Sequence, residues 1–215
     1  MKKIFLMIVA ISAMVYICRA QEYLNDSRDK VQFGFKIGVN YSNVYDTKGE
    51  AFNTQPKFGF VTGTFVAIPI GKYLGLQPEV LFSQKGFHAT GIILGSTYDF
   101  TRTTSYIDVP LLISLKPVGI LTLVAGPQYS YLLKQKDVFA NAGSSIEQEE
   151  EFENDNIRKN TLCFLGGVDI NLYRVVLSGR VGWDLLNNNG NGTSSTPRYK
   201  NVWYQVTLGF RIFNN

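Results

Sequence analysis

The chain has 215 residues, a formal net charge of +4 at pH 7, one histidine and two cysteines. Lys2, Lys3 and Arg19 supply three of the positive charges, so residues 21–215 carry a net charge of only +1. This length suits one domain, and the near-neutral charge argues against nucleic-acid binding, which requires a basic patch.

Residues 1–20 have the composition of an export signal that is removed from the mature protein. A lysine pair precedes the apolar run 4–17, and small side chains stand at the −3 and −1 positions before Gln21. The run is shorter than the ~20 residues of a membrane-spanning helix. We therefore predict a mature domain over residues 21–215. A lipoprotein anchored through Cys18 is the alternative, although Ile17 stands where a small residue is expected.

The segment 31–42 alternates between two kinds of side chain. The odd positions are apolar and the even positions are polar or glycine: Phe33, Phe35, Ile37, Val39 and Tyr41 against Gln32, Gly34, Lys36, Gly38, Asn40 and Ser42. Successive side chains on a β-strand point to opposite faces, so this pattern predicts a strand with one apolar face.

Seven further segments qualify as strands, which predicts eight in total: 31–42, 58–70, 74–85, 105–115, 120–133, 161–172, 175–186 and 201–213. Their connectors are 15, 3, 19, 4, 27, 2 and 14 residues long, so long and short ones alternate. Outer-membrane barrels have short periplasmic turns and long external loops. An even number of strands then places both termini in the periplasm.

These features predict an all-β fold, an eight-stranded antiparallel up-and-down transmembrane β-barrel. Backbone groups in a bilayer must pair with each other, so a spanning sheet has to close. Aromatic residues near the predicted strand ends suggest interfacial girdles: Tyr41, Tyr73, Tyr106, Tyr131, Tyr173, Tyr199 and Trp203. A soluble lipocalin-like binder would instead turn its apolar face inward, and here the polar, glycine-rich face suits the smaller interior.

Three prolines fall inside predicted strands, where each removes a backbone donor. Pro78, Pro110 and Pro127 are therefore expected at bulges or strand ends. The strand 58–70 is also ambiguous, because polar residues or glycine interrupt both of its faces.

Several motifs resemble the PorT-like outer-membrane β-barrel proteins, a branch of the porin-family small barrels. The resemblance covers nearly the whole mature chain and rests on Gly34–Asn43, Leu76–Gly86, Tyr106–Leu112 and Ala125–Pro127. It implies the same barrel fold, accounts for the three prolines and supplies no catalytic motif. Some relatives are implied to assist protein secretion across the outer membrane. The C-terminal residues Thr207, Gly209 and Ile212 also resemble the signal read by barrel-assembly machinery, although the chain ends on asparagine.

The face that points inward carries four cations and four anions. The alternation predicts a lumenal charge network of Lys36, Glu79, Lys85, Asp108, Asp169, Arg180, Asp184 and Arg211. Side chains just fill an eight-stranded barrel, and buried charges must be paired, so we expect a structural plug. A narrow ion path or a small-ligand site is the alternative.

Catalysis and metal binding have little support. His88 is the only histidine, in the predicted loop 86–104, where Ser96 or Asp99 could assist it in a lipid-modifying enzyme. A lone loop histidine is more often simply solvated. Only Cys163 remains after cleavage, so the mature chain can form no internal disulfide and no ordinary zinc site, and no cofactor is expected.

An acidic run stands out in the predicted loop 134–160. It contains six carboxylates and no basic residue: Glu147, Glu149, Glu150, Glu151, Glu153 and Asp155. A solvated loop is one interpretation. A contact site for a basic partner, or a weak Ca²⁺ site, is the other.

The sequence thus predicts a non-enzymatic integral protein of the bacterial outer membrane that displays external loops for binding. A role as an accessory of protein secretion or envelope assembly leads, and a narrow porin-like passage and a lipid-modifying enzyme are the alternatives. Expected partners are outer-membrane lipid, the barrel-assembly machinery during insertion, and an envelope or secretion protein.

Overall fold

The computed structural model describes residues 30–46, 54–93, 96–141, 144–150, 157–188 and 199–212. The predicted signal segment 1–20 lies outside these residues. The described part folds as nine strands: β1 Gln32–Asp46, β2 Thr54–Pro69, β3 Leu74–Ile93, β4 Ser96–Val118, β5 Leu121–Asn141, β6 Ser144–Glu150, β7 Asn160–Leu172, β8 Val175–Asp184 and β9 Tyr199–Ile212.

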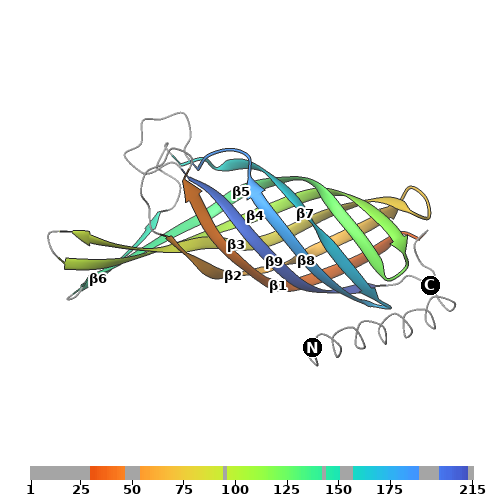
Figure 1. Cartoon of the computed structure of the whole chain (residues 1–215), viewed down its shortest axis with the longest axis horizontal. Helices are drawn as coiled ribbons and strands as arrows, with labels where there is room; N and C mark the ends of the chain where they lie inside the picture. Colours follow the sequence, from red (N-terminus) through yellow and green to blue (C-terminus); the bar gives the residue numbers. More distant parts are fainter. Residues whose placement is uncertain are drawn as a thin grey trace, which may run out of the picture.

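Eight of these strands close into an antiparallel barrel (Figure 1). Each strand pairs with its neighbours along the chain, β5 pairs with β7, and β9 returns to β1 from Phe33↔Ile212 to Asp46↔Tyr199. The predicted eight-stranded barrel is confirmed. The ninth strand, β6, stands outside the ring and pairs with the far end of β5.

The barrel wall separates apolar from polar side chains. Along β1 the outward residues Phe33 and Ile37 are 52% and 49% exposed, whereas the inward residues Lys36 and Asn40 are 2% and 0% exposed. Outward apolar residues recur on all eight barrel strands and form an apolar belt. Because exposed apolar area costs ~25 cal/mol per Å² in water, this surface suits lipid. Among the described residues, no helix is long and apolar enough to cross a membrane.

The predicted aromatic girdle is only partly correct. Tyr41, Tyr73, Tyr131 and Tyr173 are exposed on the outside, as expected. In contrast, Tyr106, Tyr199 and Trp203 point inward and are buried, with Trp203 fully enclosed. Trp203 stands at the same alternate positions of β9 as the lumenal residues. Because side chains alternate between the two faces of a strand, its ring points inward although it is aromatic.

The three prolines lie inside strands, and the expectation of bulges or strand ends is wrong. The β3–β4 ladder stops after Pro78↔Leu111 and resumes at Leu81↔Asp108 in the same register. The β4–β5 ladder stops after Pro110↔Gln128 and resumes at Ile113↔Ala125, a gap that includes Pro127. The missing backbone N–H of each proline thus coincides with a short gap in the ladder, and the strand continues beyond the gap.

Three strands are much longer than predicted. β3, β4 and β5 have 20, 23 and 21 residues, whereas β7 and β8 have 13 and 10. A tilted strand needs only ~9–11 residues to span a membrane. Their far ends, together with β6, extend beyond the barrel as a projecting sheet (Figure 1). Most of the residues predicted as the second loop, 86–104, belong to this sheet.

Candidate functional site

Glu79 is the centre of a buried charge network inside the barrel. Lys36 Nζ donates to its Oε1 and Arg180 Nη1 to its Oε2, each at 2.8 Å. Arg180 Nη2 also lies 3.4 Å from both carboxylate oxygens of Asp169. Gln77 Nε2 donates to Glu79 and Asp169 at 2.9 and 3.2 Å. Two cations thus face two anions, and the four charged residues are at most 3% exposed.

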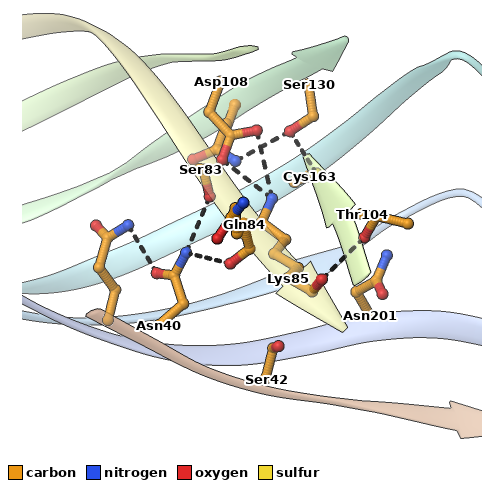
Figure 2. Close-up of polar contacts among 12 residues, drawn as sticks. Asn40, Ser42, Ser83, Gln84, Lys85, Thr104, Asp108, Ser130, Cys163 and Asn201 are labelled. Atoms are coloured by element: carbon orange, nitrogen blue, oxygen red, sulfur yellow. Dashed lines mark hydrogen bonds and ion pairs between the residues drawn. The ribbon is translucent and has the colours of Figure 1, made fainter. Parts of the chain in front are cut away.

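Lys85 forms a second network with Asp108. Its Nζ lies 3.1 Å from Asp108 Oδ2 and donates to Oδ1 at 3.3 Å (Figure 2). The same ammonium lies 3.8 Å from the ring centre of Trp203 and 4.8 Å from that of Tyr106. Cation–π contacts of this kind are strongest when the cation is desolvated, as Lys85 is at 2% exposure.

Asp184 is held mainly by neutral donors. Cys163 Sγ donates to its Oδ1 at 3.1 Å, and Asn201 donates to its Oδ2 from the backbone N at 3.0 Å and from Nδ2 at 2.5 Å. Cys163 is a free, buried thiol and also lies 3.4 Å from Ser130 Oγ. Among the described residues, Asp184 forms no ion pair within 4 Å, so its role differs from that of Glu79.

Apolar side chains pack between these polar groups. Leu112, Val124, Cys163, Leu165 and Trp203 form one cluster, and each is at most 3% exposed. Their enclosure means that the barrel has a packed interior, as expected for eight strands.

An aromatic cluster lies at the projecting end of the lumen. Phe87 packs against Phe100 and Tyr199, with ring centres 6.0 and 5.5 Å apart. Arg102 donates to both carboxylate oxygens of Asp137 at 2.8 and 2.6 Å and to the Tyr199 hydroxyl at 3.0 Å. This bidentate pair ties β4 to β5 and β9 above the charged interior.

The remaining predicted lumenal residue, Arg211, stands apart. It is half-buried at the short-turn end, where its Nη2 donates to Asn171 Oδ1, and among the described residues it joins neither charge network.

The structure also contributes residues that the sequence analysis did not single out. Gln77 and Arg102 complete polar contacts, and Asn40 donates to Ser83 Oγ at 2.9 Å (Figure 2). In the sequence, the one sign of these residues is that each stands at an inward-pointing alternate position of its strand.

The interior is sealed against solvent. A water-filled pore exposes the side chains that line it, yet the two lysines, Arg180 and their carboxylate partners are nearly inaccessible. Charges held in direct pairs inside an apolar packing cannot exchange freely with passing ions. The arrangement can hold the barrel in one shape, because each of these charges is enclosed by protein.

His88 lies on β3 and not in a loop, so the predicted position is wrong. It is half-buried, and its Nδ1 lies 2.8 Å from Thr101 Oγ1 on the neighbouring β4. Asp99 is exposed and pairs in register with Thr90, and Ser96 pairs with Ile93. His88 pairs in register with Thr101, two positions along β4 from Asp99 and five from Ser96.

The acidic run is divided between strand and undescribed residues. Glu147, Glu149 and Glu150 belong to β6, and Glu151, Glu153 and Asp155 lie outside the described residues. The prediction of one continuous loop is therefore wrong for its first half. Within the described ranges, no group of three or more histidine, cysteine or acidic residues could hold a metal ion.

Residues 19–190 match the sequence profile of the family described as outer membrane protein beta-barrel domain. This chain belongs to that family. The match spans most of the sequence, and it agrees with the closed sheet and apolar belt that a membrane requires. An outer membrane protein beta-barrel domain resides in the outer membrane, which we take as the location of this protein.

Solved structures of small outer-membrane barrels are similar to this chain at low identity. Ail, the attachment invasion locus protein of Yersinia pestis, has 14% identity and a TM-score of 0.49, covering 85% of this chain and 99% of Ail. Neisserial surface protein A has 10% identity and a TM-score of 0.49, covering 84% and 97%. OprG from Pseudomonas aeruginosa has 13% identity and a TM-score of 0.38, covering 86% and 95%. Among curated proteins, no sequence matches.

Proposed function

We propose that this outer-membrane barrel is a non-enzymatic binding protein that presents its projecting sheet and long connectors outside the cell. Protein secretion or envelope assembly is the process that it assists. The observation that carries the proposal is the contrast between a sealed lumen and strands of 20 to 23 residues that continue past the apolar belt. A barrel that only had to sit in the membrane would need neither the extra length nor the ninth strand.

The orientation follows from the connectors. The short turns and the two ends of the described barrel, Gln32 and Ile212, lie at the same end of the barrel. Short turns on the periplasmic side are typical of this class of membrane protein. We therefore place both termini in the periplasm and the projecting sheet outside. The PorT-like resemblance of the strand motifs supports the secretion role.

Lipid and the assembly machinery are the other proposed partners. The apolar belt offers contact with outer-membrane lipid, and the residues Thr207, Gly209 and Ile212 on β9 offer a signal for the barrel-assembly machinery during insertion. Nucleic acid is not a proposed partner, because the mature chain is almost neutral.

In-cell photo-crosslinking tests the binding function. A photoreactive residue replaces Tyr98, on β4, or Phe152, in the acidic segment, and captured proteins are identified by mass spectrometry. The matched control replaces Val206, which faces lipid at 53% exposure. Capture of one envelope protein from Tyr98 or Phe152 and only lipid from Val206 supports the proposal. Capture of lipid alone at every site contradicts it.

The narrow passage is the second candidate, and the inward charges are its only support. The lipid-modifying enzyme loses its basis, because among the described residues His88 contacts a threonine hydroxyl and no acid.

A further inference from the structure

β6 presents one edge of the projecting sheet. It pairs with β5 over seven residues, from Gln135↔Glu150 to Asn141↔Ser144. The edge of β5 is free to pair with β6 there, because the pairing of β5 with β7 ends at Tyr131↔Asn160. In the part of the chain that the structure describes, no strand pairs with the other edge of β6.

An open edge offers a row of backbone donors and acceptors to any extended segment. Natural edges are usually blocked by proline, charged side chains, a bulge or a very short strand. β6 contains no proline, its register with β5 has no bulge, and its only charges are glutamates, which repel an acidic strand but attract a basic one. The opposite edge of the projecting sheet, where β3 extends past its pairing with β2, is only the four residues 90–93. β6 is therefore the longer template.

The charge of β6 selects what can pair with it. Three of its seven residues are glutamates, and acidic residues continue at 151, 153 and 155. Antiparallel pairing of two copies centred on Glu147 would set that glutamate opposite its own copy, which is unfavourable. On the edge already occupied, the register places Lys136 opposite Glu149. One lysine of the chain itself thus stands opposite a glutamate of β6, although the paired segment 135–141 also contains Asp137 and has no net charge.

From these observations we infer that the free edge of β6 binds an extended, basic segment of a partner protein by strand addition. The inference rests on the proposed function and names its contact strand. Main-chain hydrogen bonds supply affinity in such complexes, and alternate side chains supply specificity. Lysine or arginine at alternate positions would complement the glutamates of β6.

A binding measurement with the full barrel in detergent tests this inference. The probe is a short fluorescent peptide that alternates lysine and valine, and its control replaces the valines with proline at equal charge. The edge variant is E147K/E149K/E150K. The matched control is E151K/E153K/D155K, which changes the same charge outside the described strand.

We expect the edge variant to bind the alternating peptide at least about tenfold more weakly than the matched control, because the two cross-strand charge pairs at the alternate positions Glu147 and Glu149 are lost and replaced by repulsion. We also expect the proline peptide to bind poorly and the alternating peptide to slow amide exchange in residues 144–150. Equal losses in both variants, or equal binding of both peptides, would show charge attraction alone and overturn the inference.

The two proposals can fail separately. If photo-crosslinking captures an envelope protein equally well in the edge variant and in wild type, the binding function stands and the β6 inference is wrong. If neither Tyr98 nor Phe152 captures a protein in wild type, the binding function itself is wrong. Heat-dependent gel mobility, which separates folded from unfolded barrels, confirms that each variant is folded.

Discussion

Trp203 can enter the lumen because the residue opposite it on β8, Gly182, has no side chain. The two residues pair in register, and a Cβ at position 182 would lie 2.3 Å from Cζ2 and 2.5 Å from Cε2 of the indole. Leu165 closes the same space from β7, with its Cδ1 2.8 Å from that position. The indole in turn covers the Lys85 ammonium, so one glycine shapes both the packing and the electrostatics of the interior.

Gly182→Ala should therefore destabilise the barrel by about 1–3 kcal/mol, because the added methyl group overpacks a rigid ring. Gly179→Ala on the same strand is the control, since a Cβ there meets nothing within 4 Å. Urea unfolding of the folded barrel in lipid vesicles measures both. A Gly182→Ala midpoint equal to that of Gly179→Ala would contradict the packing account.

Glu79→Gln should cost about 3–5 kcal/mol, because among the described residues Lys36 then has no carboxylate within 4 Å and Arg180 keeps only Asp169. Asp99→Asn removes a carboxylate from an exposed position on β4 and should have little effect. The free energies of unfolding of the two variants provide the comparison. Similar small losses would mean that the buried network contributes no more than a surface charge.

Asp184→Ala should destabilise the barrel by about 1–3 kcal/mol, whereas Asp155→Ala, outside the described residues, should not. The reason is the loss of an acceptor for the Asn201 donors and the Cys163 thiol, which leaves buried polar groups unsatisfied. Equal urea midpoints for the two variants would show that these hydrogen bonds have no net stabilising effect.

Val206→Arg should weaken the folded barrel by about 2–4 kcal/mol or block its assembly, because the side chain points to lipid. Val206→Leu keeps an apolar side chain and should behave like wild type. Gel mobility after incubation in detergent at increasing temperature reports the loss of the folded form. Wild-type stability of the arginine variant would contradict the assignment of the outer face.

The barrel and the identity of its two faces were predictable because both depend on period-two alternation. That signal is strong where lipid lies on one side and the lumen on the other, as along β1 and β9. Beyond the apolar belt the outer face is no longer apolar and the pattern reverses, since Phe87 and Ala89 are buried whereas Thr90 is exposed. For this reason the far ends of β3, β4 and β5, including His88, were assigned to loops, and β6 was missed.

The partners inside the lumen were less predictable than the inward positions. Parity places Asp184 and Lys85 on the same face, but the strand tilt and register decide that Asp184 meets Asn201 and Cys163 instead. For Trp203 the face itself was predicted wrongly. Its aromatic character suggested the membrane interface, whereas its alternate position on β9 correctly indicated the lumen. The prolines were misjudged because a barrel ladder can be interrupted locally without a shift of register.

Electrical recording from the purified barrel in a planar lipid bilayer tests the sealed lumen most directly. We predict no stepwise current from wild type under conditions in which a general porin conducts. Steps of current from wild type, with an ion preference that changes in Lys36→Glu, would show that ions pass the buried network and would contradict the account.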